Sequence, residues 1–386
     1  MLKNRKILLC VCGGIAVYKC VELASMLVKG GAVVKTIMTE SAMEFVSPLS
    51  FRTITKGSVS YKLFDNDAPI EHISLADWAD LIVIAPATAN IIGKIANGIA
   101  DDLLTTTVMV ARCTKLIVPA MNVNMWMNPI VQENLNRLKR FGMRVLEPDS
   151  GILACGIVGK GRMPMPEEIV YAVKASLYFK DDLKRKRMLV TVGGTVEQID
   201  PMRYLGNYSS GNMGLSIARA AYLRGAEVTV VYGNITEKLP YYTTNIQALS
   251  AEEMYDVVLG MYHDFDIVVM CAAVADYTPE SKSEQKIKKA DDISISLKRT
   301  KDILFELGQS KKDRQVLIGF AAESENLIDN AKDKMVKKNL NMIIANDLKY
   351  AGKGESEIVV IKKVKRRCEK HTGDKFYLAN RIMDVV

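Results

Sequence analysis

Small polar motifs directly after apolar runs are the features of this sequence that could do chemistry. Gly13-Gly14 follows the first apolar run and leaves bare backbone N–H groups before a helical pattern, which suits a phosphate. Thr39 follows the next run and could bind a ligand through its hydroxyl or simply cap a helix. Pro86, Thr88 and Asn90 stand in a small-residue motif where a flat ring could approach and be hydrogen-bonded at its edge.

Three further residues are candidates for catalysis. Asn122, after Met121, is an amide at a strand end that could hold a carboxylate or a carbonyl group. Cys155 lies within residues 151–163, where four glycines in eleven residues predict a mobile loop. Such a loop could be a lid that delivers a proton, or a surface loop with an incidental cysteine. His72 could be a catalytic histidine at a helix start or an ordinary surface residue.

The second half of the chain has its own candidate ligand groups. Ser209, Ser210 and Gly211 precede a helical pattern and form either a phosphate-binding nest or a plain helix cap. Lys334 and Lys338 are four residues apart and therefore share one helix face. Lysines gathered at strand ends suit a triphosphate, although the chain lacks the glycine-lysine motif of P-loop enzymes.

The elements that must position these residues follow one pattern that occurs twice. An apolar strand ends at two glycines, a helical segment ends at glycine, and a β-branched strand follows, which is a βαβ unit. The strand, helix and strand are expected at 6–12, 16–29 and 32–38, and again at 187–192, 214–223 and 226–231. Ligands in such folds lie beyond the carboxyl ends of the strands.

Further short apolar runs are typical of strands that are buried on both faces of a parallel sheet. They are found at 81–85, 115–119, 267–272, 316–321 and 342–345. Residues 358–364 and 366–378 are predicted to form a hairpin around Thr372-Gly373. The charged segment 179–187 separates the halves, so we expect two three-layer α/β/α domains, at 1–183 and 184–386.

Composition excludes several classes of protein. The chain has 386 residues and a net charge of +8 that is spread along its length, so nucleic acid is not an expected partner. No apolar run is long enough for a membrane span, and the first apolar stretch ends in glycines instead of a cleavage site. Seven scattered cysteines indicate reduced thiols and a cytoplasmic protein. Gly13-Gly14 does not supply the glycine fingerprint of an NAD-binding oxidoreductase.

The first half resembles a known family once its motifs are taken together. They are G-G-I-A-x-Y-K, E-H-I-x-L, P-A-T-A-N, P-A-M-N-x-x-M-W and G-x-L-A-C-G-x-x-G-x-G-R-M, in this order over residues 5–180. This half is similar to the flavin-containing cysteine decarboxylases, and most of all to the decarboxylase half of bifunctional coenzyme A biosynthesis proteins. The resemblance implies a flavodoxin-like domain that binds FMN and forms trimers with the flavin between subunits.

The resemblance also implies a reaction, the decarboxylation of 4′-phosphopantothenoyl-cysteine to 4′-phosphopantetheine. Oxidation of the cysteine thiol to a thioaldehyde creates an electron acceptor, CO₂ leaves, and the resulting enethiol receives a hydride from reduced FMN and a proton from an acid. By match, His72 is the active-site histidine, Asn122 holds the substrate carboxylate and Cys155 donates the proton. The implied FMN and substrate contacts are Gly13, Gly14, Thr39, Pro86, Thr88, Asn90 and Met121.

The second half, residues 187–386, resembles the ligase half of the same family, and this resemblance implies a Rossmann-like ligase domain. It contains D-P-x-R-Y-x-x-N-x-S-S-G-x-M-G, A-A-V-A-D-Y, K-I-K-K, G-F-A-A-E and A-N-D in order. The implied reaction activates 4′-phosphopantothenate with CTP and Mg²⁺ as an acyl-cytidylate, which the cysteine amine attacks. By match Asn207 acts on the acyl-cytidylate, and Arg203 lies near the substrate phosphate or at a dimer contact. The implied nucleotide and substrate contacts are Ser209, Ser210, Gly211, Asp276, Lys286, Lys289, Lys301, Asp302, Ile303, Leu304, Phe320, Lys334 and Lys338.

One departure and one alternative accompany this interpretation. The family usually reads G-G-T-R-E-P after the first strand of the ligase, whereas this chain has Val196 and Gln198 in place of the arginine and the proline. The alternative is a flavoprotein regulatory subunit, but such proteins often lose the cysteine that this chain keeps as Cys155. Trimers of the first half and dimers of the second would close into a dodecamer. The sequence identifies no metal ligands.

Overall fold

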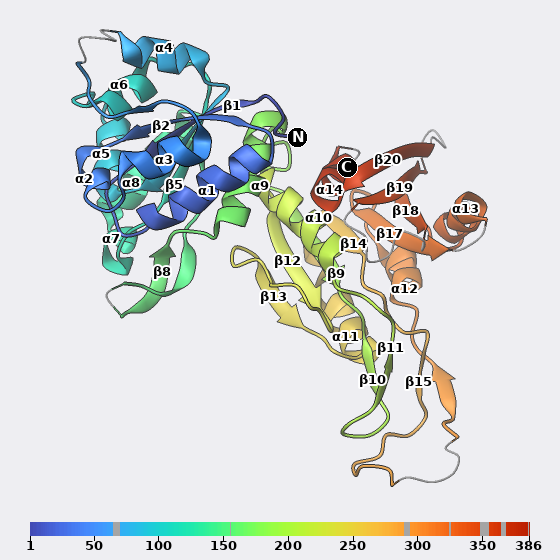
Figure 1. Cartoon of the computed structure of the whole chain (residues 1–386). Coiled ribbons are helices and arrows are strands. Elements are labelled where there is room, and N and C mark those ends of the chain that lie inside the picture. Colours follow the sequence, from blue (N-terminus) through green and yellow to red (C-terminus); the bar gives the residue numbers. More distant parts are fainter. Residues whose placement is uncertain are drawn as a thin grey trace. The chain divides into compact units, whose positions relative to one another are not determined.

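The computed structural model describes residues 1–64, 70–154, 156–288, 294–323, 326–347, 355–363, 368–384 and 386 (Figure 1). The chain divides into two compact units, Met1–Lys180 and Asp181–Val386, which are described separately below. Cys155 and Lys289, two residues of the expected sites, lie outside the described residues.

The first unit is built on a parallel sheet of six strands. They are β1 (Lys6–Val11), β2 (Val33–Met38), β3 (Val59–Ser60), β4 (Leu81–Ala87), β5 (Thr114–Pro119) and β6 (Arg144–Val145). The spatial order is β3-β2-β1-β4-β5-β6, and every neighbouring pair is parallel. Without the two-residue edge strand β3, this is the flavodoxin order. The expected fold class of the first half is confirmed.

Helices cover both faces of this sheet. They are α1 (Val17–Lys29), α2 (Glu40–Met43), α3 (Pro48–Thr55), α4 (Glu71–Trp78), α5 (Ala89–Ala96), α6 (Leu103–Val110), α7 (Val123–Met127), α8 (Pro129–Arg140) and α9 (Pro166–Tyr178). Helix α1 packs on α3 and α9, whereas α4 packs on α6 and α5 packs on α8. Every residue of β4 is buried, because both faces of the central strands are covered.

The glycine-rich segment around Cys155 differs from the predicted mobile loop. It contains an antiparallel hairpin of β7 (Asp149–Ile152) and β8 (Val158–Arg162). The sequence of this segment did not indicate strands, because its glycines break the apolar pattern by which strands are recognised. Strands β7 and β8 pair mainly through their backbones, and their apolar residues Ile152 and Val158 are exposed. The hairpin returns the chain to the sheet edge, where the N–H of Met121 donates to the carbonyl of Gly161 at 2.9 Å.

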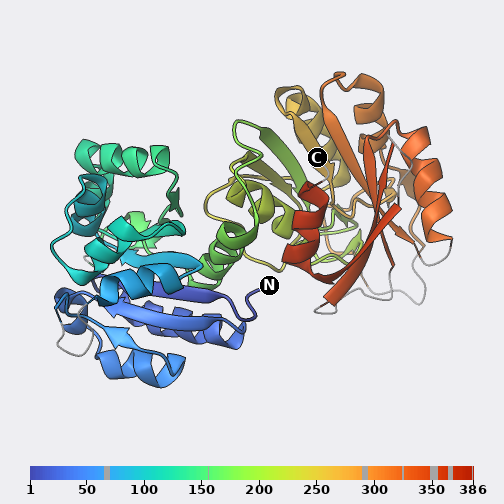
Figure 2. The ribbon, with the colours of Figure 1, turned by 90° about the horizontal axis from the view of Figure 1, so that it is seen from above.

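The second unit has an eight-stranded sheet in the order β13-β12-β9-β14-β17-β18-β19-β20. The strands are β9 (Arg187–Val192), β12 (Glu227–Tyr232), β13 (Thr244–Gln247), β14 (Ile267–Met270), β17 (Val316–Glu323), β18 (Met342–Asp347), β19 (Glu355–Lys362) and β20 (Cys368–Asp374). All neighbours are parallel except that β19 is antiparallel to both β18 and β20. Figure 2 shows the orange and red strands at one end of the sheet. The parallel part follows Rossmann order, as expected.

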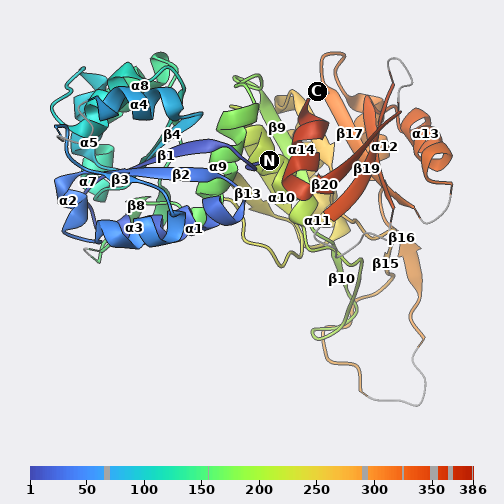
Figure 3. The same cartoon turned by 45° about the horizontal axis from the view of Figure 1, so that its top comes forward.

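Five α-helices and a short 3₁₀ helix, among the described residues, accompany this sheet. They are α10 (Asn212–Leu223), α11 (Ala251–Met261), η1 (Tyr262–Asp264), α12 (Ile303–Ser310), α13 (Leu327–Lys337) and α14 (Lys375–Met383). Two short antiparallel ribbons, β10 (Val196–Gln198) with β11 (Tyr204–Gly206) and β15 (Tyr277–Pro279) with β16 (Leu297–Arg299), form an arm that extends away from the sheet (Figures 1 and 3).

The C-terminal hairpin is present, but its predicted turn is wrong. Thr372 and Gly373 lie inside β20, where they pair with Glu357 and Ser356 of β19. Asp374 then caps α14 by accepting the N–H of Tyr377 at 2.7 Å, so the residues from Lys375 onward are helical. Thr-Gly resembled a hairpin turn, whereas here it is the last part of a strand that runs into a helix cap.

Candidate functional site

A cavity of about 1200 Å³ lies beyond the carboxyl ends of the strands of the first sheet. All six residues expected to bind the cofactor line it: Gly13, Gly14, Thr39, Pro86, Thr88 and Asn90. Met121 and Asn122 line the same cavity. Residues that are 109 positions apart in the chain are thus brought to one cavity, because parallel strands end at the same edge of a sheet.

The two glycines of the first turn have different surroundings. A Cβ atom on Gly13 would overlap Ser41, with the carbonyl carbon of Ser41 at 2.7 Å and its oxygen at 2.8 Å. A Cβ on Gly14 would meet only the Cγ2 of Thr88, at 3.9 Å. Gly13 therefore allows the β1 turn to pack against the start of α2, whereas Gly14 leaves space at the cavity wall.

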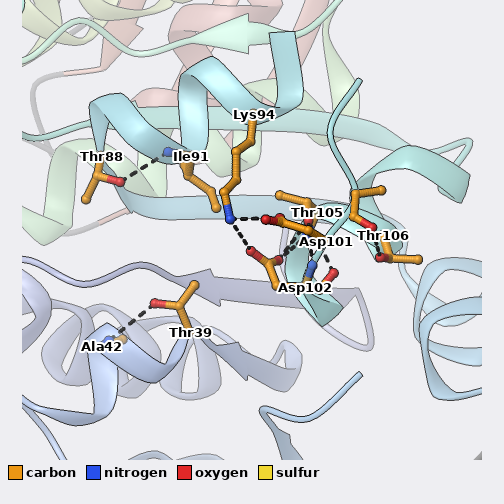
Figure 4. Close-up of polar contacts among 10 residues, drawn as sticks. Thr39, Ala42, Thr88, Ile91, Lys94, Asp101, Asp102, Thr105 and Thr106 are labelled. Atoms are coloured by element: carbon orange, nitrogen blue, oxygen red, sulfur yellow. Dashed lines mark hydrogen bonds and ion pairs between the residues drawn. The ribbon is translucent and has the colours of Figure 1, made fainter. Parts of the chain in front are cut away.

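Thr39 and Thr88 are both helix caps and cavity residues (Figure 4). The Oγ1 of Thr39 accepts the N–H of Ala42 at 3.2 Å at the start of α2. The Oγ1 of Thr88 accepts the N–H of Ile91 at 3.3 Å at the start of α5. The two interpretations of Thr39 are therefore compatible, because a capping hydroxyl fixes the backbone whose ends line the cavity.

A lysine and two aspartates that the sequence analysis did not single out also line this cavity. The Nζ of Lys94 contacts Asp101 at 2.7 Å and Asp102 at 3.2 Å (Figure 4). Asp102 is held in place by a capping box with Thr105. The ion pairs raise the pKa of Lys94 and lower that of Asp101, first of all through the hydrogen bond between them. The D-x-x-T spacing was the available signal for this cap.

Lys19 and Arg162 form a second pair of charged residues on the wall. Lys19 is only 7% exposed, and its Nζ donates to the carbonyl of Met163 at 3.2 Å. Burial lowers the pKa of Lys19, and the nearby Arg162 lowers it further. Within the described ranges the guanidinium of Arg162 has no hydrogen bond and no carboxylate within ion-pair distance. Asp149 and Glu22 act in the opposite direction on Lys19, but neither forms an ion pair with it or with Arg162.

The expected catalytic residues of the first half are not all at the cavity. Asn122 lines it and caps α7, because its Oδ1 accepts the N–H of Asn124 at 2.8 Å. His72 lies on α4 and does not line the cavity of its own chain. The Nδ1 of His72 is buried and has no hydrogen-bond partner among the described residues. Cys155 lies outside the described residues, between β7 and β8.

The second unit has a cavity of about 770 Å³ at the carboxyl edge of its own sheet. Most of the nucleotide and substrate residues expected there line it: Asn207, Ser209, Ser210, Gly211, Asp276, Lys301, Asp302, Ile303, Leu304, Phe320, Lys334 and Lys338. Gly211 has a positive φ of 79° and caps α10. The Nδ2 of Asn207 donates to the carbonyl of Val274 at 3.1 Å.

Three lysines of this cavity, all expected from the sequence, have protein partners. Lys338 pairs with Asp302 at 2.8 Å, and Lys334 donates to the carbonyl of Phe320 at 2.9 Å. Lys301 lies 3.6 Å from Glu252 and stacks over the ring of Tyr255. These contacts fix the directions of the three side chains, which a cation site for phosphate groups requires.

Two expected residues are not part of this wall, and a third lies outside the described residues. Arg203 and Lys286 do not line the cavity. The guanidinium of Arg203 lies 3.7 Å from Asp200 and donates to the carbonyl of Ile287 at 3.3 Å. Lys286 is exposed, and Lys289 lies outside the described residues. The expected site residues in turn did not include the part of the wall formed by β19 and α14, which is lined by Ser356, Glu357, Ile358 and Lys375.

The two residues that depart from the family pattern lie away from the cavity wall. Val196 and Gln198 are in β10 and pair with Gly206 and Tyr204 of β11. Between them, the buried Glu197 accepts the N–H of Ala251 at 2.8 Å. Thr195, just before, accepts the N–H of Ala275 at 2.9 Å. This segment fixes the loop after β14, and the departures do not remove a residue from the wall itself.

Two kinds of feature are absent from the described residues. These residues contain no group of three or more His, Cys, Asp or Glu side chains placed to hold a metal ion. Within the same part of the chain, no helix has the length and apolar character to cross a membrane.

Comparisons with known proteins agree with this division into halves. A family model described as "Flavoprotein" matches residues 1–178, and one described as "DNA/pantothenate metabolism flavoprotein C-terminal domain" matches residues 183–386. A "Cysteine/Cysteine sulfinic acid decarboxylase" from an unknown prokaryotic organism is 45% identical over 318 residues, covering 80% of this chain and 88% of that protein.

Two relatives match along almost the whole chain. The "Coenzyme A biosynthesis bifunctional protein CoaBC" of Bacillus subtilis (strain 168) is 48% identical over 372 residues, which cover 94% of this chain and 91% of the relative. The protein of the same description from Borreliella burgdorferi is 43% identical over 367 residues and 94% of each chain. The chain therefore belongs to the family of bifunctional coenzyme A biosynthesis enzymes, in which a flavoprotein decarboxylase and a ligase share one polypeptide.

Proposed function

We propose that the first unit uses FMN to convert 4′-phosphopantothenoyl-cysteine into 4′-phosphopantetheine and CO₂. The observation that carries this proposal is the cavity at the sheet edge, whose wall contains every residue expected to contact the flavin. The start of α1 and the caps of α2 and α5 all border it, so backbone N–H groups are available for a phosphate. The wall beside Pro86 to Asn90 is small and apolar enough for a flat ring.

Different residues would carry out different parts of this reaction. Bound FMN would act as the oxidant of the substrate thiol, and its reduced form would return the hydride to the enethiol. Asn122 would hold the departing carboxylate, because its Oδ1 is used as a helix cap and its Nδ2 is the group suited to donate. Cys155 would supply the proton. Replacement of Cys155 by serine is expected to leave CO₂ release intact and to stop the final reduction, so oxidised product should accumulate.

The position of His72 favours an assembly in which subunits complete one another's cavities. His72 is absent from the cavity of its own chain, and the side chains of Ile15, Tyr18 and Phe64 at that cavity are exposed. The proposal therefore includes trimers of the first unit and dimers of the second, which together form a dodecamer in the cytoplasm. Co-expression of the His72→Asn and Cys155→Ser chains tests it: mixed oligomers should regain decarboxylation, whereas inactive mixtures would contradict shared sites.

For the second unit we propose that CTP activates 4′-phosphopantothenate as an acyl-cytidylate, which cysteine then attacks. Support comes from the cation-rich cavity of the second unit and from the serine-glycine nest at α10. The described residues offer no preformed metal site, so Mg²⁺ would be bound largely by phosphate oxygens, with Asp276 as a neighbouring carboxylate. Asn207 would act on the acyl group.

Product analysis by mass spectrometry tests both halves together. The full chain is incubated with FMN, 4′-phosphopantothenate, cysteine and Mg²⁺, with CTP or ATP or no nucleotide. We expect 4′-phosphopantetheine, CO₂ and pyrophosphate with CTP. Pyrophosphate with ATP alone would change the nucleotide, and no pyrophosphate with either would refute the ligase. Free cysteine is included as a decarboxylation substrate, because one relative is named for that activity.

A further inference from the structure

Lys375 lies in the part of the second cavity that sequence motifs did not predict. It is the first residue of α14, it is half-buried, and it lines the cavity together with Ser356, Glu357 and Ile358 of β19. The carboxylate of Glu357 is paired with Lys370 at 2.9 Å. Its ammonium has no ion pair and no hydrogen bond with any described residue. A half-buried cation of this kind gains most from an anionic partner that comes from outside the chain.

Helix α14, which begins at Lys375, and its neighbour α10 run in the same direction. Helices α10 and α14 pack side by side (Figure 3). At the end of α10, the guanidinium of Arg224 donates to the carbonyl of Asn380 at 3.2 Å and to Asp384 at 2.8 Å, near the end of α14. Because the C-terminal ends are joined in this way, both N-termini point toward the cavity edge. Their dipoles add to the charge of Lys375 there.

Lys375 differs from the other lysines of the same cavity. Lys338 is compensated by Asp302, and Lys301 is close to Glu252. Arg299 also has no carboxylate within ion-pair distance among the described residues, but it is exposed on the arm. Lys375 therefore combines partial burial with an uncompensated charge.

The charge of Lys375 acts on a thiol at the end of the central strand β14. The thiol of Cys271, directly after β14, also lines the cavity. Burial raises the pKa of Cys271 to about 12, and Lys375 acts in the opposite direction. The ammonium therefore lies near enough to the end of the central strand to act on Cys271, and the nest of Ser209 to Gly211, where a phosphate is expected, lines the same cavity.

We propose that Lys375 is a substrate-binding residue whose ammonium holds a phosphate group of a ligase substrate lying at the N-terminus of α10. This inference rests on the proposed ligase function. Two substrates supply such a group, the triphosphate of CTP and the phosphate monoester of 4′-phosphopantothenate. Lys375 forms one wall of the phosphate site and the nest of α10 forms the other.

Steady-state kinetics of the full chain test this proposal through pyrophosphate release. In Lys375→Gln, the KM for one phosphorylated substrate should rise about tenfold, as expected for a lost charge-assisted hydrogen bond. The KM for cysteine, which has no phosphate, should not change. Lys375→Arg should restore most of the affinity. A rise confined to CTP assigns the triphosphate, and a rise confined to 4′-phosphopantothenate assigns the monoester.

The matched control is Lys186→Gln, which removes an exposed lysine at the opposite, amino end of β9. Decarboxylation by the first unit serves as an internal control for folding. The inference is overturned if neither phosphorylated substrate is affected, if the KM for cysteine rises equally, or if only kcat falls. If the unaltered chain releases no pyrophosphate, the ligase proposal itself fails, and that result is recognisable without any variant.

Discussion

The two cavities occupy the same place in two related sheets, but their walls differ in composition. The first has a wall rich in apolar side chains, among them Ile15, Leu103 and Met125, together with bare glycine backbone. The second is bordered by lysines from the segment before α12, from α13 and from α14. A flat aromatic ligand with one phosphate suits the first wall, and a polyphosphate suits the second.

The cavities also differ in how their geometry is fixed. At the first cavity the close approach of Gly13 to Ser41 determines the position of the β1 turn. At the second cavity, side-chain contacts such as Lys338 with Asp302 determine where the cations point. A steric change should therefore damage the first site most, whereas removal of a single charge should damage the second.

The largest effect is expected for Gly13→Val. The new side chain would overlap the backbone of Ser41, so the start of α2 must move, at a cost of about 1–3 kcal/mol. We expect the purified protein to lose at least nine-tenths of its flavin absorbance and its decarboxylase activity, while pyrophosphate release by the second unit persists. The control is Gly93→Ala, where a Cβ meets only the side-chain nitrogen of Asn134, at 3.8 Å. Normal flavin content in Gly13→Val would contradict the steric argument.

The next effect concerns the second cavity. Lys338→Gln should raise the KM for the nucleotide about tenfold, because a directed cation is lost. Asp302→Asn should leave this KM unchanged or lower it, since asparagine still caps α12 and the charge of Lys338 is no longer compensated. Flavin content should be unaffected in both variants. Equal increases in KM would show that the ion pair matters only for the local fold.

These contrasts also show what the sequence could predict. The strand ends, and with them the flavin-cavity residues from Gly13 to Asn122, followed from apolar runs and motif order. The part of the second cavity around Lys375 could not be predicted in this way, because it depends on the antiparallel strand β19 and on where the C-terminal hairpin ends. Thr372-Gly373 looked like a turn and is part of a strand. His72 matched a motif, but a motif match does not tell where the side chain lies in the fold, and on α4 it does not line the cavity.

A smaller effect is expected from the buried cation of the first cavity. Burial lowers the pKa of Lys19, so between that pKa and 10.5 the unfolded chain binds more protons than the folded one. The free energy of unfolding of the flavin-free protein should therefore rise with pH in this range, and less so in Lys19→Met. Urea unfolding followed by tryptophan fluorescence reports on this unit alone, because Trp78 and Trp126 both lie in it. Identical pH profiles would contradict the assignment.

The smallest effect is expected from restoring the usual family residue at position 196 in β10, which tests whether this departure influences the ligase. Val196→Arg restores the residue that the family usually has, but position 196 lies in the β10–β11 ribbon and does not line the cavity. We expect the KM values for nucleotide and 4′-phosphopantothenate to change less than threefold. Glu197→Gln is the informative comparison, because Glu197 is buried and accepts the N–H of Ala251. If Val196→Arg improved ligase turnover tenfold, the arm would have to reach the substrate, and the second site would depend on more than the wall described above.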